Sequence, residues 1–146
     1  MRKLARIVML VSMLAVTLVI AGPAAAGKPT CEGQLIISDA AVVDGTCGPD
    51  LIIAFGTGQT INGSDGDDDI FVDGGSATVY AGRGKDVVYG SDQGDRIEAG
   101  DGSDTVSGYG GDDTINGGNG NDIIVGGNGI DTCTQGRGTG SVDCEN

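Results

Sequence analysis

Aspartate recurs in this sequence at a spacing that could hold cations. From Gly45 to Thr134 the chain divides into ten rows of nine residues without an insertion or deletion, and the first row starts at Gly45. The sixth column is aspartate in eight rows, at Asp50, Asp68, Asp86, Asp95, Asp104, Asp113, Asp122 and Asp131. Carboxylates together with backbone carbonyls supply the six to eight oxygen ligands that a hard cation such as calcium takes. The residues therefore indicate cation coordination.

The composition excludes several other functions. The chain has no His, so Ser-His-Asp triads, Cys-His pairs and His-ligated zinc are all ruled out. A formal charge of −13 would repel nucleic acid and favours cations as partners. With 29 Gly, no Trp and 3% aromatic residues, the chain cannot build a thick globular core.

Two further columns stay in phase with the aspartates. The fourth column is Gly in eight rows, and fails only at Thr57 and Gln93. The eighth column is Ile or Val in nine rows, at Ile52, Ile61, Ile70, Val79, Val88, Ile97, Val106, Ile115 and Ile124, with Cys133 in the tenth. Glycine permits tight turns, and the residues around column eight form a minimal strand with the apolar side chain facing inward. A generic Gly/Asp-rich sequence would not keep three columns in phase.

The rows resemble the RTX (haemolysin-type) calcium-binding nonapeptide G-G-x-G-x-D-x-U-x, in which U is a large apolar residue. Residues 117–125 read G-G-N-G-N-D-I-I-V and fit it at every position. The match is strong in the last five rows, Gln93 excepted, and looser before them. The resemblance implies an all-β parallel β-roll, or β-solenoid, of about five coils with two rows per coil. Small secreted stand-alone repeat proteins of this kind would bind several calcium ions, up to about six.

The same resemblance implies where the ions would lie. Rows of equal parity stack, so each ion would sit between turns that are two rows apart in the sequence. Its ligands would be the two column-six aspartates and backbone carbonyls around Gly66, Gly84, Gly102, Gly111, Gly120 and Gly129.

The two edges of such a roll would bind calcium unequally. Odd rows carry an unbroken aspartate column and make up to four sites. In the even rows, Gln59 and Ala77 replace the first two aspartates, so only Asp95, Asp113 and Asp131 can pair, in up to two sites. Gln59 could lend one neutral oxygen, and Ala77 offers no side-chain ligand. We therefore expect the N-terminal half of the even edge to be metal-free.

Two sites are expected to be weaker than their neighbours. The 50/68 site is expected to bind calcium less tightly because Cys47 and Pro49 depart from the usual turn, and Gln93 weakens the 95/113 site.

Aligned carboxylates about 5 Å apart repel each other by roughly 3 kcal/mol at an effective dielectric near 20. We therefore expect the calcium-free chain to be largely disordered.

Alternative chemistries fit less well. The acidic stretch 65–70 places Ile70 where an EF-hand loop needs its Gly and has no Glu six residues on, so that motif fails. The rows leave only short flanking segments, with no room for a separate catalytic domain, so we expect no enzyme.

The N-terminal segment 1–26 has the layout of a secretory signal peptide. Arg2, Lys3 and Arg6 precede an apolar run over 7–20, and an A-x-A cleavage site ends at Ala26. An uncleaved anchor is the alternative, although the run is short for a membrane span. We expect a secreted, extracellular product, with a 27–44 N-terminal cap, a 45–134 β-roll and a 135–146 C-terminal cap. Within the first cap, 34–44 is expected to form an irregular extra rung.

The four cysteines allow three disulfide connectivities. Nearly five coils, roughly 23 Å at about 4.8 Å per coil, would separate Cys47 from Cys133, against a limit near 7 Å between Cα atoms. We therefore predict that Cys31 pairs with Cys47 and that Cys133 pairs with Cys144, closing each end. Free thiols are the alternative.

Outward positions suggest a possible partner surface. The odd rows carry apolar residues there, at Leu51, Ile53, Phe71, Val87, Tyr89, Ile123 and Val125. A homodimer or another protein could cover this strip, the segment Leu35 to Val43 could cover it, or it could have no partner. An adhesive or partner-binding module is thus the alternative function. Ice binding is a further one, based on Thr60, Thr78, Thr114 and Thr132, but Arg96 interrupts that column.

Overall fold

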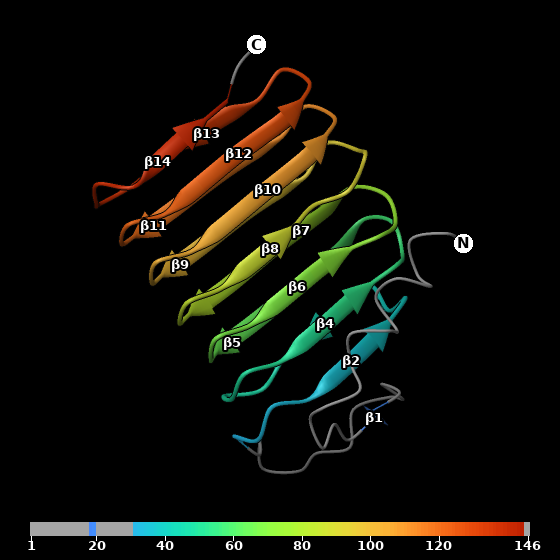
Figure 1. The fold of residues 1–146 in the computed structure, drawn as a ribbon. Coiled ribbons are helices and arrows are strands. Elements are labelled where there is room, and N and C mark those ends of the chain that lie inside the picture. Colours follow the sequence, from blue (N-terminus) through green and yellow to red (C-terminus); the bar gives the residue numbers. More distant parts are fainter. Residues whose placement is uncertain (1–17, 20–30, 145–146) are drawn as a thin grey trace.

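The computed structural model describes residues 18–19 and 31–144, and they fold into a solenoid of parallel strands (Figure 1). None of the described residues is helical, and accordingly no helix among them could cross a membrane. The strands are β1 Leu18–Val19, β2 Leu35–Ser38, β3 Val42–Asp44, β4 Leu51–Ala54, β5 Gln59–Asp65, β6 Asp69–Val72, β7 Ala77–Arg83, β8 Val87–Tyr89, β9 Arg96–Asp101, β10 Thr105–Gly110, β11 Thr114–Asn119, β12 Ile123–Asn128, β13 Thr132–Thr134 and β14 Ser141–Asp143. The predicted all-β parallel roll is confirmed.

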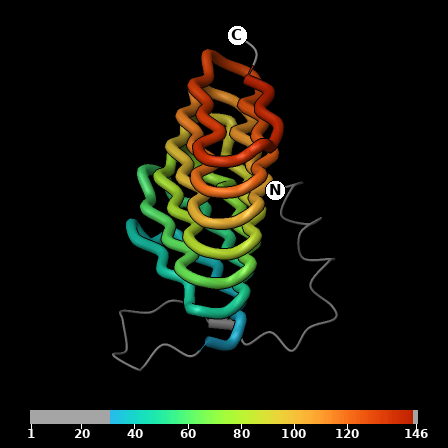
Figure 2. Tube along the Cα trace, turned by 90° about the vertical axis from the view of Figure 1, so that its left-hand side faces the viewer, coloured from blue at the N-terminus to red at the C-terminus, as the bar shows by residue number. Residues whose placement is uncertain are grey.

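Odd and even rows form separate sheets, because the chain crosses from one to the other at every turn (Figure 2). One sheet has the order β1-β2-β4-β6-β8-β10-β12-β14, and the other has the order β13-β11-β9-β7-β5-β3. From β3 and β4 onward, each strand pairs in parallel with the strand two rows later, as in Ile52 with Ile70 and Ile97 with Ile115. Two rows therefore make one coil, as the resemblance to RTX repeats implies.

A single narrow core runs between the two sheets. The Ile and Val side chains of column eight fill it and are at most 1% exposed in all nine rows. Column one, two residues further on, also faces inward and holds small residues such as Ala54, Ala81 and Ala99. Large and small columns thus alternate across the core. This arrangement lets the two sheets pack closely with few large side chains.

Both ends of the repeat region carry extra strands. β2 pairs with β4 in the register Leu35 with Leu51, because the turn from β2 to β3 is two residues short of the usual row. The irregular extra rung predicted over 34–44 is therefore present. At the other end, β14 pairs with β12 at the regular two-row offset, with Val142 beside Ile124. Part of the segment assigned to the C-terminal cap, 135–143, is thus an eleventh row.

Disulfides close both ends as predicted. Cys31 bonds to Cys47 with a Cα–Cα distance of 4.4 Å, and Cys133 bonds to Cys144 with a Cα–Cα distance of 6.2 Å. Cys133 and Cys144 also pack against the hydrophobic core. Each bridge therefore joins a terminal segment to the nearest coil.

Two expectations concern the N-terminal region. The predicted signal peptide lies outside the described residues except for Leu18–Val19, which form β1 and pair with β2. The segment Leu35 to Val43 extends both sheets at their ends, and does not cover the outer face of the odd-row strands. The prediction that this segment covers the apolar strip is therefore wrong.

Candidate metal-binding turns

The stacking brings the predicted aspartates together along the two edges where the chain turns. All eight are buried, with the largest exposure at Asp131, 8%. Aspartates of neighbouring coils follow each other at the two-row offset, on the edge of the roll that their row parity assigns. Burial of a carboxylate is costly unless hydrogen bonds or a cation compensate it.

One oxygen of each carboxylate has a fixed structural partner. Oδ1 accepts a hydrogen bond from the backbone N–H of the column-six residue one coil earlier. Asp86 Oδ1, for example, accepts from the N–H of Asp68 at 2.9 Å, and Asp113 Oδ1 accepts from that of Asp95 at 2.7 Å. The remaining bonds of this ladder end on Asp68, Asp95, Asp104, Asp122 and Asp131, and Gln34 donates to Asp50. The Oδ1 atoms therefore link adjacent coils through hydrogen bonds.

The second oxygen is the one that fits a cation. Among the described residues, Oδ2 is buried and accepts no hydrogen bond in Asp68, Asp86, Asp104, Asp113 and Asp131. Such an oxygen loses its hydration without compensation, which is a rare and costly arrangement in a protein. A hard cation is the partner that a buried carboxylate oxygen and nearby carbonyls prefer.

Three aspartates have Oδ2 already bonded. Asp50 Oδ2 accepts from the N–H of Thr46, and Asp95 Oδ2 accepts from the N–H of Ser91 at 2.7 Å. Asp122 Oδ2 accepts from the side-chain amide of Gln135 at 3.2 Å. These turns satisfy their carboxylate from within the protein.

The backbone at column two separates the open turns from those that a turn N–H closes. Six of the eight aspartate rows have a left-handed residue there, at Ser64, Gly82, Gly100, Tyr109, Gly118 and Gly127, with φ between +73° and +117°. Thr46 and Ser91 do not have positive φ, and their N–H groups are the ones that bond Oδ2 of their own aspartate. The conformation of one residue thus decides whether the turn N–H occupies the carboxylate. Sequence reasoning missed this feature.

The column-four glycines bring carbonyls close to the next coil. A Cβ at Gly84 would overlap the carbonyl oxygen of Gly66, and a Cβ at Gly102 would overlap that of Gly84. The same holds for Gly120 over Gly102 and for Gly129 over Gly111. These four positions must therefore be glycine, and the carbonyl oxygens of Gly66, Gly84, Gly102 and Gly111 lie against the next turn along the same edge.

Burial also changes the acidity of the aspartates. Burial raises the pKa of Asp68 to about 7, and the negative charges of Asp86 and Asp50 raise it further. A backbone hydrogen bond from Asp50 lowers this pKa but does not offset the increase. Burial likewise raises the pKa of Asp86 and of Asp113 to about 6. It also raises the pKa of Asp95 and of Asp104. The carboxylates are held in an environment that disfavours their charge.

Column six carries no charge in the N-terminal half of the even edge. The amide of Gln59 is 1% exposed, accepts from the N–H of Gly56 at 2.7 Å and donates to the carbonyl of Ala40 at 2.7 Å. Its oxygen is therefore already bonded to its own turn. The next coil has Ala77, which offers only its backbone, and its N–H donates to Asp95 Oδ1 at 2.7 Å.

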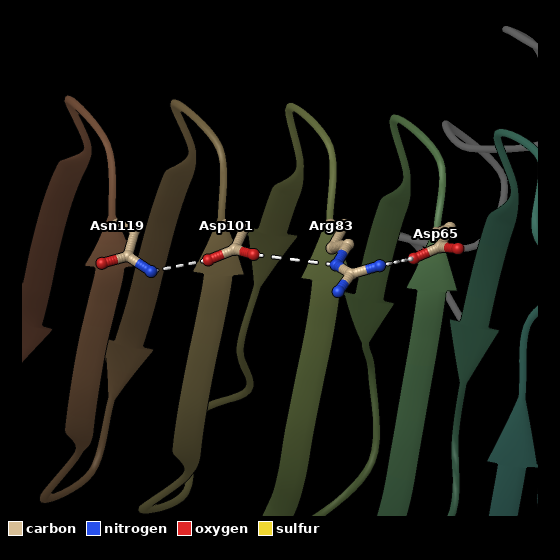
Figure 3. A network of polar contacts seen from close by, with 4 residues as sticks. All are labelled: Asp65, Arg83, Asp101 and Asn119. Carbon is tan, nitrogen blue, oxygen red and sulfur yellow. Dashed lines mark hydrogen bonds and ion pairs between the residues drawn. The ribbon is translucent and has the colours of Figure 1, made fainter.

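A different set of acidic residues lies outside the turns (Figure 3). Arg83 lies between Asp65 and Asp101, at 3.8 and 3.7 Å, and the amide of Asn119 donates to Asp101 at 2.6 Å. These column-three side chains are exposed, so each ion pair contributes about 1 kcal/mol or less. Their carboxylates have protein partners, unlike the open Oδ2 atoms of column six.

No single point in the described part of the chain gathers three or more acidic, Cys or His side chains. A cation between two turns would therefore take two carboxylates at most and would need carbonyls for the rest. The repeated glycine turns supply such carbonyls.

Comparison with known families agrees with this geometry. The profile of the RTX calcium-binding nonapeptide repeat, in four copies, matches residues 60–79, 72–106 and 98–133, which together span just over half of the chain. The chain belongs to this RTX repeat family. Searches of curated proteins and of solved structures found no significant match. RTX repeats bind calcium, so this is a calcium-binding repeat protein.

The outward residues of this RTX roll are only partly exposed. In the predicted apolar strip, Ile123 and Val125 are exposed, Ile53 is buried at 5%, and Leu51, Phe71, Val87 and Tyr89 are half-buried. Thr105 and Ser107 separate the exposed pair from the others in the strand register. The strip is thus not uniform. On the other sheet, Arg96 lies between Thr78 and Thr114 and pairs with Glu98.

Proposed function

We propose that this chain is a secreted, calcium-binding repeat protein whose roll folds when calcium occupies its turns. The observation that carries the proposal is the set of five buried Oδ2 atoms without a hydrogen-bond donor. Each such atom opposes folding of the metal-free chain, because the unfolded carboxylate is hydrated. A bound calcium ion would remove that cost and cancel the repulsion between neighbouring carboxylates.

The proposed ligands are the column-six aspartates and the turn carbonyls around Gly66, Gly84, Gly102, Gly111, Gly120 and Gly129. Both partners have an open Oδ2 in the pairs 68/86, 86/104 and 113/131, which are therefore the strongest sites. One partner is already bonded in 50/68, 95/113 and 104/122, which are therefore the weaker ones. We expect no ion beside Gln59 and Ala77.

Secretion is proposed from the layout of residues 1–26 and is supported by the two disulfides, which persist in oxidising compartments. We propose no catalytic role, since the polar residues of the turns are arranged as metal ligands and the family binds calcium.

Circular dichroism of the chain from Gly27 onward tests the proposal. In chelator the far-UV spectrum should be that of a coil, and added calcium should restore β structure with a smaller hydrodynamic radius. Magnesium should substitute poorly, because it demands tighter octahedral geometry. Full β structure retained in chelator would contradict calcium-driven folding. In a calcium-soaked crystal, an ion beside Ala77 would contradict the site assignment.

A further inference from the structure

A groove of about 540 Å³ lies where strand β8 ends, on the edge of the roll that carries the even-row turns. Three aromatic residues line it, Phe71, Tyr89 and Tyr109, together with the acidic residues Asp73 and Asp92. It is separate from the column-six carboxylates, none of which lines it.

The three rings form one continuous wall. The rings of Phe71 and Tyr89 stack with centroids 5.0 Å apart and planes inclined by 22°. Tyr89 then meets Tyr109 at a centroid distance of 6.0 Å and an angle of 49°. The small side chain of Ser107 neighbours Tyr89 in the strand register, so the next ring comes from Tyr109. Aromatic rings in such a row present electron-rich faces and electron-poor edges to a ligand.

Tyr109 occupies a backbone position that suits glycine. Its φ is +73°, in the left-handed region, and the same column holds Gly82, Gly100, Gly118 and Gly127. A side chain there is strained, and Tyr109 is 48% exposed at the groove. Backbone strain of this kind is often found at functional sites. Core packing does not account for an exposed tyrosine here.

Hydrogen bonds within one turn hold the opposite wall. The turn from Ser91 to Asp95 closes through the hydrogen bond from the Ser91 N–H to Asp95 Oδ2, and the Gln93 N–H donates to Ser91 Oγ at 3.0 Å. Ser91, Asp92 and Gln93 all line the groove. Its shape is therefore set by hydrogen bonds within the protein.

The charges around the groove select the kind of ligand. Its lining has two aspartates and no Lys or Arg, in a chain of net charge −13. An anion would be repelled, whereas a cation would gain from the carboxylates and from the faces of the rings. A guanidinium gains more than an ammonium, because it is planar, stacks on aromatic rings and pairs with carboxylates through two parallel hydrogen bonds.

We propose that this groove binds an arginine side chain presented by a partner peptide. The guanidinium lies against the Tyr89–Tyr109 wall and pairs with the carboxylate of Asp92 or Asp73. This site goes beyond calcium binding, and the calcium-bound roll holds it in place.

The test is a titration of the ¹⁵N-labelled calcium-loaded protein with N-acetyl-Gly-Arg-Gly-amide, followed by NMR. The matching lysine and citrulline peptides serve as probes, since citrulline keeps the shape of arginine without its charge. We expect saturable shifts confined to amides at 71–74, 89–93 and 109, with the arginine peptide binding more tightly than lysine. The citrulline peptide should bind roughly tenfold or more weakly, which corresponds to about 1.4 kcal/mol.

The Tyr109→Gly variant separates binding from folding, because glycine suits the left-handed backbone at this position. Its thermal midpoint should stay the same or rise while its affinity for the arginine peptide falls. The control Tyr80→Ser removes a tyrosine that is 44% exposed on the other sheet, and should bind normally. Equal binding of the citrulline peptide, stronger binding of a neutral saccharide, or full affinity in Tyr109→Gly would overturn the proposal. Because each of these is measured on folded protein, failure here is distinguishable from failure of calcium-driven folding.

Discussion

At the scale of single residues, backbone conformation matters as much as side-chain identity. Ser64 and Ser91 occupy the same column, four residues before an aspartate, yet only Ser64 has positive φ. The N–H of Ser91 consequently bonds Asp95 Oδ2, whereas Asp68 Oδ2 stays open. Two identical residues thus place their turns in different classes.

The Ser91→Gly variant should convert a closed turn into an open one. Glycine adopts positive φ without steric cost, so the N–H can turn away from Asp95 and leave Oδ2 to a cation. We expect tighter calcium binding at the 95/113 site, measured by isothermal titration calorimetry. Ser91→Ala is the matched control, because it removes the hydroxyl but keeps the Cβ that disfavours left-handed backbone, and its affinity should not rise. Equal gains in both variants would show that the hydroxyl, and not the backbone, closes the turn.

The contrast between Ser64 and Ser91 also marks the limit of sequence reasoning. Column periodicity predicts the strands and the recurring turn aspartates, because each follows from a residue type repeated in phase, and the resemblance to RTX repeats implies the two-row stacking. The φ of column two depends on how a whole turn packs against its neighbours, so a serine there could not be assigned to either class. The eleventh row was missed for a related reason, since Gly140 stands where the aspartate would mark it.

At the scale of the turn and its neighbours, each aspartate serves two coils. Asp86 Oδ1 accepts from Asp68, the Asp86 N–H donates to Asp104 Oδ1, and its open Oδ2 belongs to two proposed sites. Removing one such carboxylate therefore affects the turns on both sides.

The Asp86→Ala variant should lose calcium at two adjacent sites and melt at a lower temperature in calcium. Loss of the acceptor leaves the buried N–H of Asp68 unpaired, which costs about 1–3 kcal/mol by itself. Calorimetric stoichiometry and a thermal melt at fixed calcium measure the two effects. Asp39→Ala removes an exposed carboxylate outside the rows and should change neither. If the stoichiometry fell by one ion or none, the shared-ligand arrangement would be wrong.

At the scale of the whole molecule, the buried carboxylates make stability depend on pH in opposite directions with and without calcium. The pKa values of about 7 for Asp68 and about 6 for Asp86 and Asp113 lie above the unfolded value of about 3.9. The folded metal-free chain therefore binds protons more strongly than the unfolded chain does. The stability that this proton binding contributes is fully present below about pH 4 and is lost as pH rises through 6 to 7.

In chelator, the β signal in circular dichroism should accordingly be larger at pH 5 than at pH 8. In excess calcium the order should reverse, because protons compete with calcium for the same oxygens. Asp68→Asn should reduce the pH dependence seen in chelator, since asparagine does not titrate. A metal-free chain that gains β structure between pH 5 and pH 8 would contradict the buried, uncompensated state of these carboxylates.

The two-row register also fixes which changes of chain length the molecule can absorb. In the described part of the chain each coil pairs with the coils before and after it, so removing one whole coil joins equivalent surfaces. Deletion of 99–116 would bring Val88 beside Ile124 and Asp86 beside Asp122, with every column intact. Deletion of 99–107 alone would move all later rows to the opposite sheet, stacking Asp113 against Asp86 and Tyr109 against Gly82. We expect the first deletion to yield a shorter calcium-folded roll and the second to lose cooperative melting, although it removes fewer residues. We therefore expect the roll to tolerate insertion or loss of a pair of repeats better than insertion or loss of one repeat.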